Sequence, residues 1–105
     1  MTRGPLVVVG DALLDVDVIG AVHRICPDAP VPVLDVSDER PRPGGAALAA
    51  LLAARDGTDV VLVTAIGSDA GGDRLRELLD GMLELCAGPL SGATPVKSRV
   101  RAGGQ

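Results

Sequence analysis

The stretch GGAALAALLAARDGTDVVLVTAIG, residues 44–67, decides the fold expected of this chain. Its glycine pair is followed by an Ala and Leu run, Ala46–Ala54, and the RDG of residues 55–57 is typical of a helix end. Because the run is apolar on every side, we expect the helix to be buried against a sheet. Residues 60–67, VVLVTAIG, are rich in β-branched side chains and predict a buried strand. Together they indicate an α/β protein with a parallel sheet.

The residues before the glycine pair predict two more strands. Residues 5–10, PLVVVG, form a short apolar run ending in glycine, which predicts a strand buried on both faces. Residues 14–22, LDVDVIGAV, alternate instead, with apolar side chains on one face and Asp15 and Asp17 on the other. This second piece is therefore expected to be a half-exposed strand with a wet face.

A small antiparallel β flap is expected over residues 14–36. Pro30 and Pro32 are two positions apart, so their missing N–H donors fall on the same side of an extended chain. This pattern predicts an edge strand that is paired on one side only. The linker of residues 37–45 carries two further prolines and is expected to be extended.

Beyond residue 67 the pattern predicts a second helix and a last strand. Asp69 is well placed to cap this amphipathic helix. Its apolar face follows a helical spacing through Leu75, Leu78, Leu79, Met82 and Leu83. A turn region at residues 88–93 then precedes an alternating strand at residues 94–102. Since the chain stops near this strand with no closing helix, we interpret residues 1–105 as the N-terminal portion of a larger domain.

Composition limits the classes of function. The 105 residues are 47% hydrophobic and 23% charged with a net charge of −4, which fits a globular protein and makes nucleic acid an unexpected partner. We expect no membrane association, because no apolar run approaches the roughly 18–20 residues of a membrane span. No secretory leader is recognisable either, so a cytoplasmic location is expected.

The cysteines and the lone histidine do not predict a metal site. Cys26 and Cys86 are far apart with no CxxC pair, and His23 is the only histidine, so soft ligands are too few for a zinc cage. Both thiols are interpreted as small buried hydrophobes. The chain has no Phe, Tyr or Trp, so aliphatic packing supplies the whole core.

Two constellations near the first strand could bind a ligand. Asp11 follows the strand directly and Asp15 comes four residues later, at the sheet end where α/β proteins gather ligands. Such carboxylates can accept hydrogen bonds from sugar hydroxyls, although a turn cap and a solvated strand residue explain them as well. Gly44 and Gly45 allow close backbone approach at a helix start, and a simple hinge is the alternative.

A third constellation lies on the last strand. Lys97, Arg99 and Arg101 fall on one face by their period of two, which would suit an anion. A solvated face of the strand explains the same row of charges.

Taken together, these stretches resemble the ribokinase-like (PfkB) carbohydrate kinases. The segment of residues 44–67 is similar to their first signature, apart from Leu48, which stands where Asn is usual. VVVGDALLDVDVIG and RICPDAPVPVLDV are similar, more narrowly, to the kinase half of bacterial bifunctional heptose enzymes, which phosphorylates D-glycero-D-manno-heptose 7-phosphate at O1. TPVKSRVRAGGQ resembles that subfamily's T-x-x-K-x-R strand and the Gln-containing turn after it.

The resemblance implies a fold, a reaction and site residues. It implies a ribokinase-like partial sheet with a β lid, and a sugar site at Asp15 with Asp11 beside it and at Gly44 and Gly45. Lys97 and Arg99 are then candidates for a sugar phosphate, with Arg24 a weaker third. Catalytic residues, ATP and Mg belong to a C-terminal part that these 105 residues lack, so no catalytic residue is expected here. The lid implies a homodimer.

Three other interpretations stay open. Leu48 allows a kinase for another sugar or a nucleoside, because an aliphatic side chain cannot form the hydrogen bonds of Asn. A short non-catalytic protein that keeps only sugar binding or dimerisation is the second. A Rossmann nucleotide-binding module is the third and fits less well, since GDALLD and not GxGxxG follows the first strand.

Overall fold

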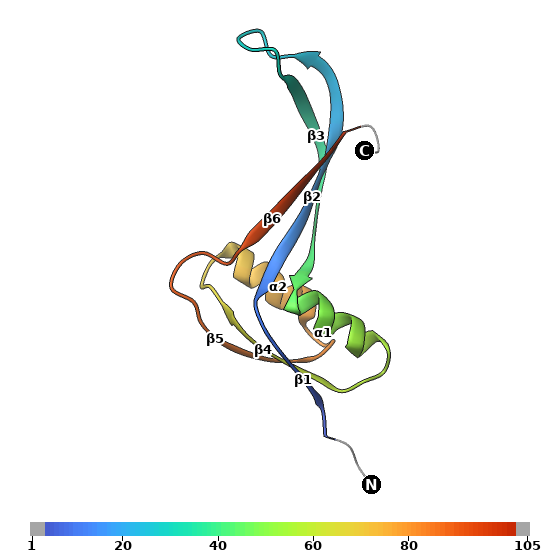
Figure 1. Ribbon diagram of the computed structural model, residues 1–105, viewed down its shortest axis with the longest axis vertical. Helices are drawn as coiled ribbons and strands as arrows, with labels where there is room; N and C mark the ends of the chain where they lie inside the picture. The colour runs from blue at the N-terminus through green and yellow to red at the C-terminus, as the bar shows by residue number, and fades with distance from the viewer. Residues whose placement is uncertain (1–3, 103–105) are drawn as a thin grey trace. The chain divides into compact units, whose positions relative to one another are not determined.

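The computed structural model describes residues 4–102, in which six strands and two helices are found (Figure 1). Their bounds are β1 (Leu6–Val9), β2 (Ala12–Ile25), β3 (Pro32–Gly45), α1 (Ala46–Arg55), β4 (Val60–Ile66), α2 (Ala70–Leu79), β5 (Glu84–Pro89) and β6 (Val96–Ala102). The strands form two sheets, β1-β4-β5 and β3-β2-β6. The chain divides into two compact units, unit 1 up to Asp15 with Arg42–Lys97, and unit 2 from Val16–Pro41 with residues from Ser98 onward.

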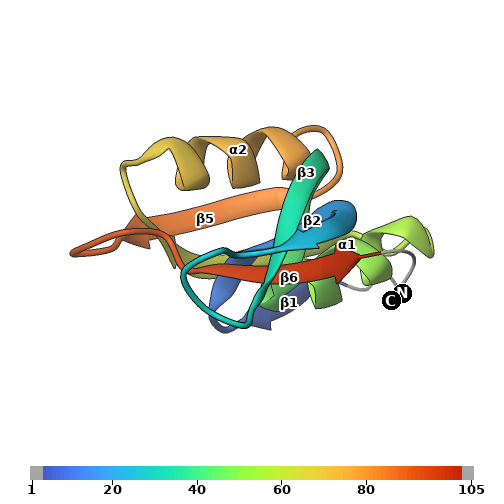
Figure 2. The same cartoon turned by 90° about the horizontal axis from the view of Figure 1, so that it is seen from above.

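Unit 1 is built on a parallel sheet with β4 at its centre. β4 pairs with β1 from Val60 opposite Leu6, and with β5 from Val61 opposite Glu84. Alternate β4 side chains point to one face, where both helices cover them; Figure 2 shows α2 lying along β5. The resulting core contains Ala12, Ala47, Ala50, Val60, Leu62, Ile66, Leu75 and Leu79. The expected α/β architecture is confirmed.

The other face of this sheet has no cover among residues 4–102. Val7 is 53% exposed and Val9 is 74% exposed, so the prediction of a first strand buried on both faces is wrong for this chain. The same holds for α1, which was expected to be buried all round. Leu48 and Leu52 are exposed on it, because the helix packs on one sheet face and its outer side meets no described element.

The second helix is capped as predicted but ends earlier. An Asp69 carboxylate oxygen accepts a hydrogen bond from the Gly72 N–H at 2.9 Å. The helix stops at Leu79, and Gly81, with φ of 74°, turns the chain before Met82 and Leu83, which were wrongly placed on the helix. The chain then forms β5, a strand that the sequence pattern did not predict.

Unit 2 contains the predicted flap. β2 and β3 are joined by a short turn that the Cys26 N–H closes on the Val31 carbonyl at 2.7 Å, so they run antiparallel. β3 is at the edge of its sheet, as the prolines predicted, but it extends through the linker of residues 37–45. The strand of residues 14–22 was predicted to expose its Asp residues to solvent, and this prediction is wrong at Asp17. This residue is 9% exposed and interacts with another group of the chain.

Two smaller expectations can also be compared with the structure. Cys26 is half-buried and Cys86 is exposed, so the interpretation of both thiols as buried hydrophobes is wrong for Cys86, which lies on the bare face of the sheet. Neither of the helices in residues 4–102 has the length and apolar character needed to cross a membrane.

Because the helices cover only one face of the sheet, we predict that shortening a side chain lowers the free energy of unfolding by different amounts on the two faces. Leu62 is fully buried under the helices, so Leu62→Ala should lower the free energy of unfolding by about 2–5 kcal/mol. Val9→Ala, on the bare face, should change it by less than about 0.5 kcal/mol. Denaturant unfolding of the two variants checks this, and equal losses would show that something covers Val9 in solution.

Candidate functional site

The turn between β1 and β2 is held against the start of α1. The Ala46 N–H donates to the Asp11 carbonyl at 2.9 Å, which ties the first residue of the helix to the end of the first strand. Gly45 has a φ of 59°, and a Cβ built there would lie 2.5 Å from the Asp11 carbonyl oxygen. A side chain at Gly45 would therefore be both strained and obstructed.

Gly44 lies directly against the side chain of Asp15. A Cβ built on Gly44 would lie 2.8 Å from an Asp15 carboxylate oxygen and 2.5 Å from Leu13 Cδ1. The glycine pair thus makes room for the residues of β2 that face it. Four predicted site residues, Asp11, Asp15, Gly44 and Gly45, are brought together in unit 1 by these contacts.

A cavity of about 270 Å³ opens beside these residues at the carboxyl ends of β1 and β4. Its walls are apolar except for the exposed Asp11, and they are formed by Asp11, Ala12, Leu13, Ala65, Leu90 and Pro95. In open parallel sheets, ligands bind at this end of the strands. The cavity gives a small polyol apolar walls for its C–H surface and a carboxylate for its hydroxyls.

Two buried threonines hold the walls of the cavity. The Thr64 hydroxyl on β4 accepts a hydrogen bond from the Ala12 N–H at 3.0 Å. The Thr94 hydroxyl accepts one from the Gly67 N–H at 2.9 Å and donates to an Asp69 carboxylate oxygen at 2.7 Å. Neither hydroxyl is used to contact solvent, since Thr64 is 8% and Thr94 is 3% exposed.

Asp69 is the charged member of this arrangement. Hydrogen bonds from the Thr94 hydroxyl, the Thr94 N–H and the Gly72 N–H lower the pKa of its carboxyl group. Because the folded-state pKa is below the unfolded value of about 3.9, Asp69 stabilises the fold above that pH. Its contribution is lost as the pH falls through the lowered folded pKa.

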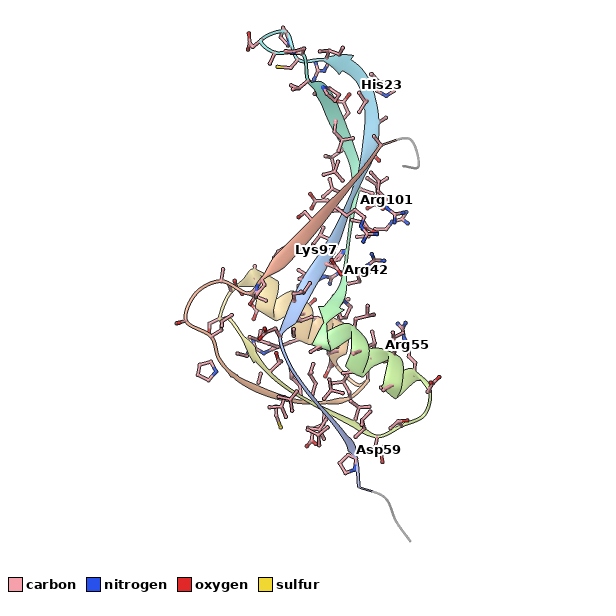
Figure 3. The ribbon with its side chains drawn as sticks, in the orientation of Figure 1. His23, Arg42, Arg55, Asp59, Lys97 and Arg101 are labelled. Carbon is pink, nitrogen blue, oxygen red and sulfur yellow. The ribbon has the colours of Figure 1, made fainter. Side chains whose placement is uncertain are left out.

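The predicted phosphate-binding cations are divided between the two units. Lys97, labelled in Figure 3, is exposed in unit 1 at the start of β6. Arg99 and Arg101 lie in unit 2, and Arg24 there is 3.8 Å from Asp35. The anion-binding role of these side chains stays a prediction. The Gln-containing turn of residues 103–105 lies outside the described residues.

The described residues offer no ready-made cluster of metal ligands. Within residues 4–102, no three His, Cys, Asp or Glu side chains gather closely enough to hold a cation.

Sequence reasoning missed the threonines and most of the cavity walls. The strand patterns gave Thr64 and Thr94 no role in a site, and they did not indicate that Leu13, Leu90 or Pro95 would line a cavity. A signal existed for Thr64, the one hydroxyl in an otherwise aliphatic strand, since a buried polar group needs a partner.

The fold is that of the ribokinase-like carbohydrate kinases. Phosphofructokinase-2 from Escherichia coli in complex with fructose-6-phosphate matches with a TM-score of 0.77 at 20% identity, over 96% of this chain and 33% of that one. Arabidopsis thaliana ribokinase complexed with ribose and ATP matches with a TM-score of 0.68 at 21% identity, over 99% of this chain and 34% of that one. These identities establish the fold alone.

The sequence itself is similar to the N-terminal part of the bifunctional HldE proteins. The protein of this name from Streptomyces coelicolor is 59% identical over 100 residues, which is 95% of this chain and 22% of that protein. The chain thus spans about a fifth of the length of this relative. No family model matches the chain.

The contact between Gly44 and Asp15 predicts a cost for any side chain at this glycine. Gly44→Ala should lower the free energy of unfolding by about 1–3 kcal/mol, because Leu13 and Asp15 must move away from the added methyl group. Gly88→Ala is the matched control, since its Cβ would meet only the Thr64 carbonyl at 3.9 Å. Denaturant unfolding measures both, and a neutral Gly44→Ala would contradict this packing.

Proposed function

We propose that this chain is the sugar-binding part of an ATP-dependent carbohydrate kinase that phosphorylates D-glycero-D-manno-heptose 7-phosphate at O1. The observation that carries the proposal is the 59% identity to an HldE protein, which extends over 95% of the chain and so includes the residues of the candidate site. The ribokinase-like fold supports the same class of enzyme. Such an enzyme works where ATP is available, which favours the cytoplasm.

The candidate site has the chemistry that a polyol requires. Ionised carboxylates accept hydrogen bonds from hydroxyl groups, and Asp15 is only half-buried, so its oxygens can reach a ligand. The glycine pair leaves space beside Asp15, and the Asp11 side chain borders the cavity. We assign Asp15 as the main anchor of the sugar, with Asp11 beside it.

The phosphate group of the sugar is assigned to cations of β6. Lys97 is exposed and has no ion-pair partner among residues 4–102, so its ammonium group is available to an anion. Arg99 is proposed as the second contact and Arg24 as a weaker third. A row of solvated charges remains the alternative for this strand.

A kinase for another sugar or a nucleoside is the second candidate, and Leu48 favours it. This residue replaces the Asn usual in the resembling family and is 39% exposed on α1. An aliphatic side chain cannot bind hydroxyls, so the acceptor could differ from a heptose. A panel of phosphosugars, sugars and nucleosides tested as substrates of the complete protein separates the two candidates.

ATP, Mg and the catalytic base are proposed to belong to sequence outside these 105 residues. The chain corresponds to 22% of the Streptomyces relative, and the family resemblance puts the groups that act around the γ-phosphate in a C-terminal part of the kinase domain. We therefore propose that the isolated chain is inactive. Reading the coding sequence past Gln105 decides between a longer kinase and a short non-catalytic protein, which is the alternative.

Substitutions in the complete protein test the sugar site. Asp15→Asn should raise the sugar KM about 10- to 100-fold, because hydrogen bonds to a charged group contribute about 1.5–3 kcal/mol. The ATP KM should change little. Lys97→Ala should weaken a 7-phosphorylated sugar far more than its unphosphorylated analogue, and equal losses with both sugars would exclude Lys97 as a phosphate ligand.

The flap is proposed as the surface of a homodimer. Unit 2 exposes several aliphatic side chains, which include Val22, Ile25, Val31, Val36 and Val100. Exposed apolar groups of this kind mark interaction surfaces, and β3 is an edge strand. A two-fold dimer would cover them.

Charged substitutions in the flap test the dimer. The double variant Val31→Asp, Val33→Asp should shift the complete protein from dimer toward monomer, because it places four carboxylates in one two-fold interface. The control adds the same charge in unit 1 through Thr58→Asp and Met82→Asp, both exposed, and should stay dimeric. Light scattering gives the mass, and an unchanged dimer in the flap variant would reject this interface.

A further inference from the structure

We infer that Thr94 is a positioning residue of the sugar site: through Asp69 it fixes the segment Leu90–Pro95 as one wall of the cavity. This inference rests on the proposed function for its ligand. Its structural basis is a set of contacts within unit 1 that centre on one buried hydroxyl group.

Thr94 is held by two separate parts of unit 1. Its hydroxyl accepts from the Gly67 N–H, just after β4, and donates to Asp69, the cap of α2. Its N–H donates to the second Asp69 oxygen at 2.8 Å. The strand end, the helix start and the loop before β6 are thereby joined at a single residue.

Two glycines, Gly67 and Gly72, lie close to the Thr94 hydroxyl. A Cβ built on either Gly67 or Gly72 would lie 2.9 Å from Thr94 Oγ1, so both glycines are required for the loop to dock. A Cβ on Gly72 would also collide with the Gly67 carbonyl. Gly67, Asp69 and Gly72 therefore form the packing site of the Thr94 side chain.

The segment that Thr94 anchors forms a wall of the cavity. Residues 90–95 have no helix or strand, yet Leu90 and Pro95 line the cavity on either side of Thr94 in the sequence. The Pro95 carbonyl accepts from the Leu14 N–H at 2.9 Å, which joins the end of the segment to β2. Lys97, the proposed phosphate ligand, follows two residues later.

The part of the cavity wall formed by Asp11–Leu13 has its own anchor. Residues Asp11–Leu13 are held by the Ala12 N–H bond to Thr64 and by the link from Asp11 to Ala46. Neither bond involves Thr94. Without the Thr94 hydroxyl, the segment Leu90–Pro95 would keep only the Thr94 N–H bond to Asp69 and the Pro95 bond to Leu14. Loss of the Thr94 hydroxyl should therefore loosen this wall and leave the Asp11–Leu13 wall in place, which widens the cavity without unfolding unit 1.

Variants of the complete protein test this inference through kinetics. Thr94→Val removes only the hydroxyl and should raise the sugar KM about 10- to 100-fold, with kcat and the ATP KM changed much less. Thr94→Ser restores the hydroxyl and should restore the KM. Leu79→Ala is the control for stability alone, since Leu79 is buried in α2 away from this cavity and its loss should lower Tm with the sugar KM unchanged.

Hydrogen–deuterium exchange of the ligand-free protein gives a readout that needs no substrate. Thr94→Val should speed exchange at Gly67 and across residues 90–95, while Thr94→Ser and Leu79→Ala should not. An unchanged sugar KM or unchanged exchange in Thr94→Val overturns the inference, as does an equal rise in KM for Leu79→Ala. If the unmodified protein phosphorylates no sugar, the proposed function fails, and the exchange result alone decides whether Thr94 fixes the wall.

Discussion

Burial of one side of β4 is the interaction on which unit 1 depends. Leu62 and Ile66 are fully enclosed, and both helices pack on them with Ala47, Ala50, Leu75 and Leu79. With no aromatic residue in the chain, the core cluster of unit 1 is this narrow aliphatic layer. Small side chains on α1 let its backbone lie close to the sheet, which in turn places Gly44 and Gly45 against the end of β1.

The polar contacts at the carboxyl end of the sheet build on that layer. Thr64 continues the inward row of β4 and replaces the next aliphatic contact with a hydrogen bond to Ala12. Thr94 does the same for the loop before β6. Because unpaired buried polar groups are costly, each bond restricts the backbone to one position more strictly than an apolar contact would. The cavity is thus bordered both by Ala12, which belongs to the core, and by the loop of residues 90–95, which the Thr94 hydrogen bonds hold.

The helices and the central strands could be predicted from local sequence patterns, whereas the pairings between residues far apart in the sequence could not. The run of residues 46–54 and the β-branched strand after it were predictable because their signals are local. β5 was missed because ELCAGP has little strand character, and its pairing with β4 exists only through the crossover. Of the site, Asp11, Asp15, Gly44 and Gly45 were found from sequence and resemblance, whereas Thr94 was missed because its partners lie 25 and 27 residues away.

The uncovered face of the sheet limits the edge at which further strands could be added so that their helices cover it. The crossovers from β1 to β4 and from β4 to β5 run in the same direction across the sheet, and the right-handed rule puts both helices on one face. Strands added beyond β5 would again place helices on that covered face. Only strands added beyond β1 would place helices over Val7 and Val9. A sheet that grows this way reverses its winding at β1, so Asp11 would stand at the switch point where open α/β sheets bind their ligands.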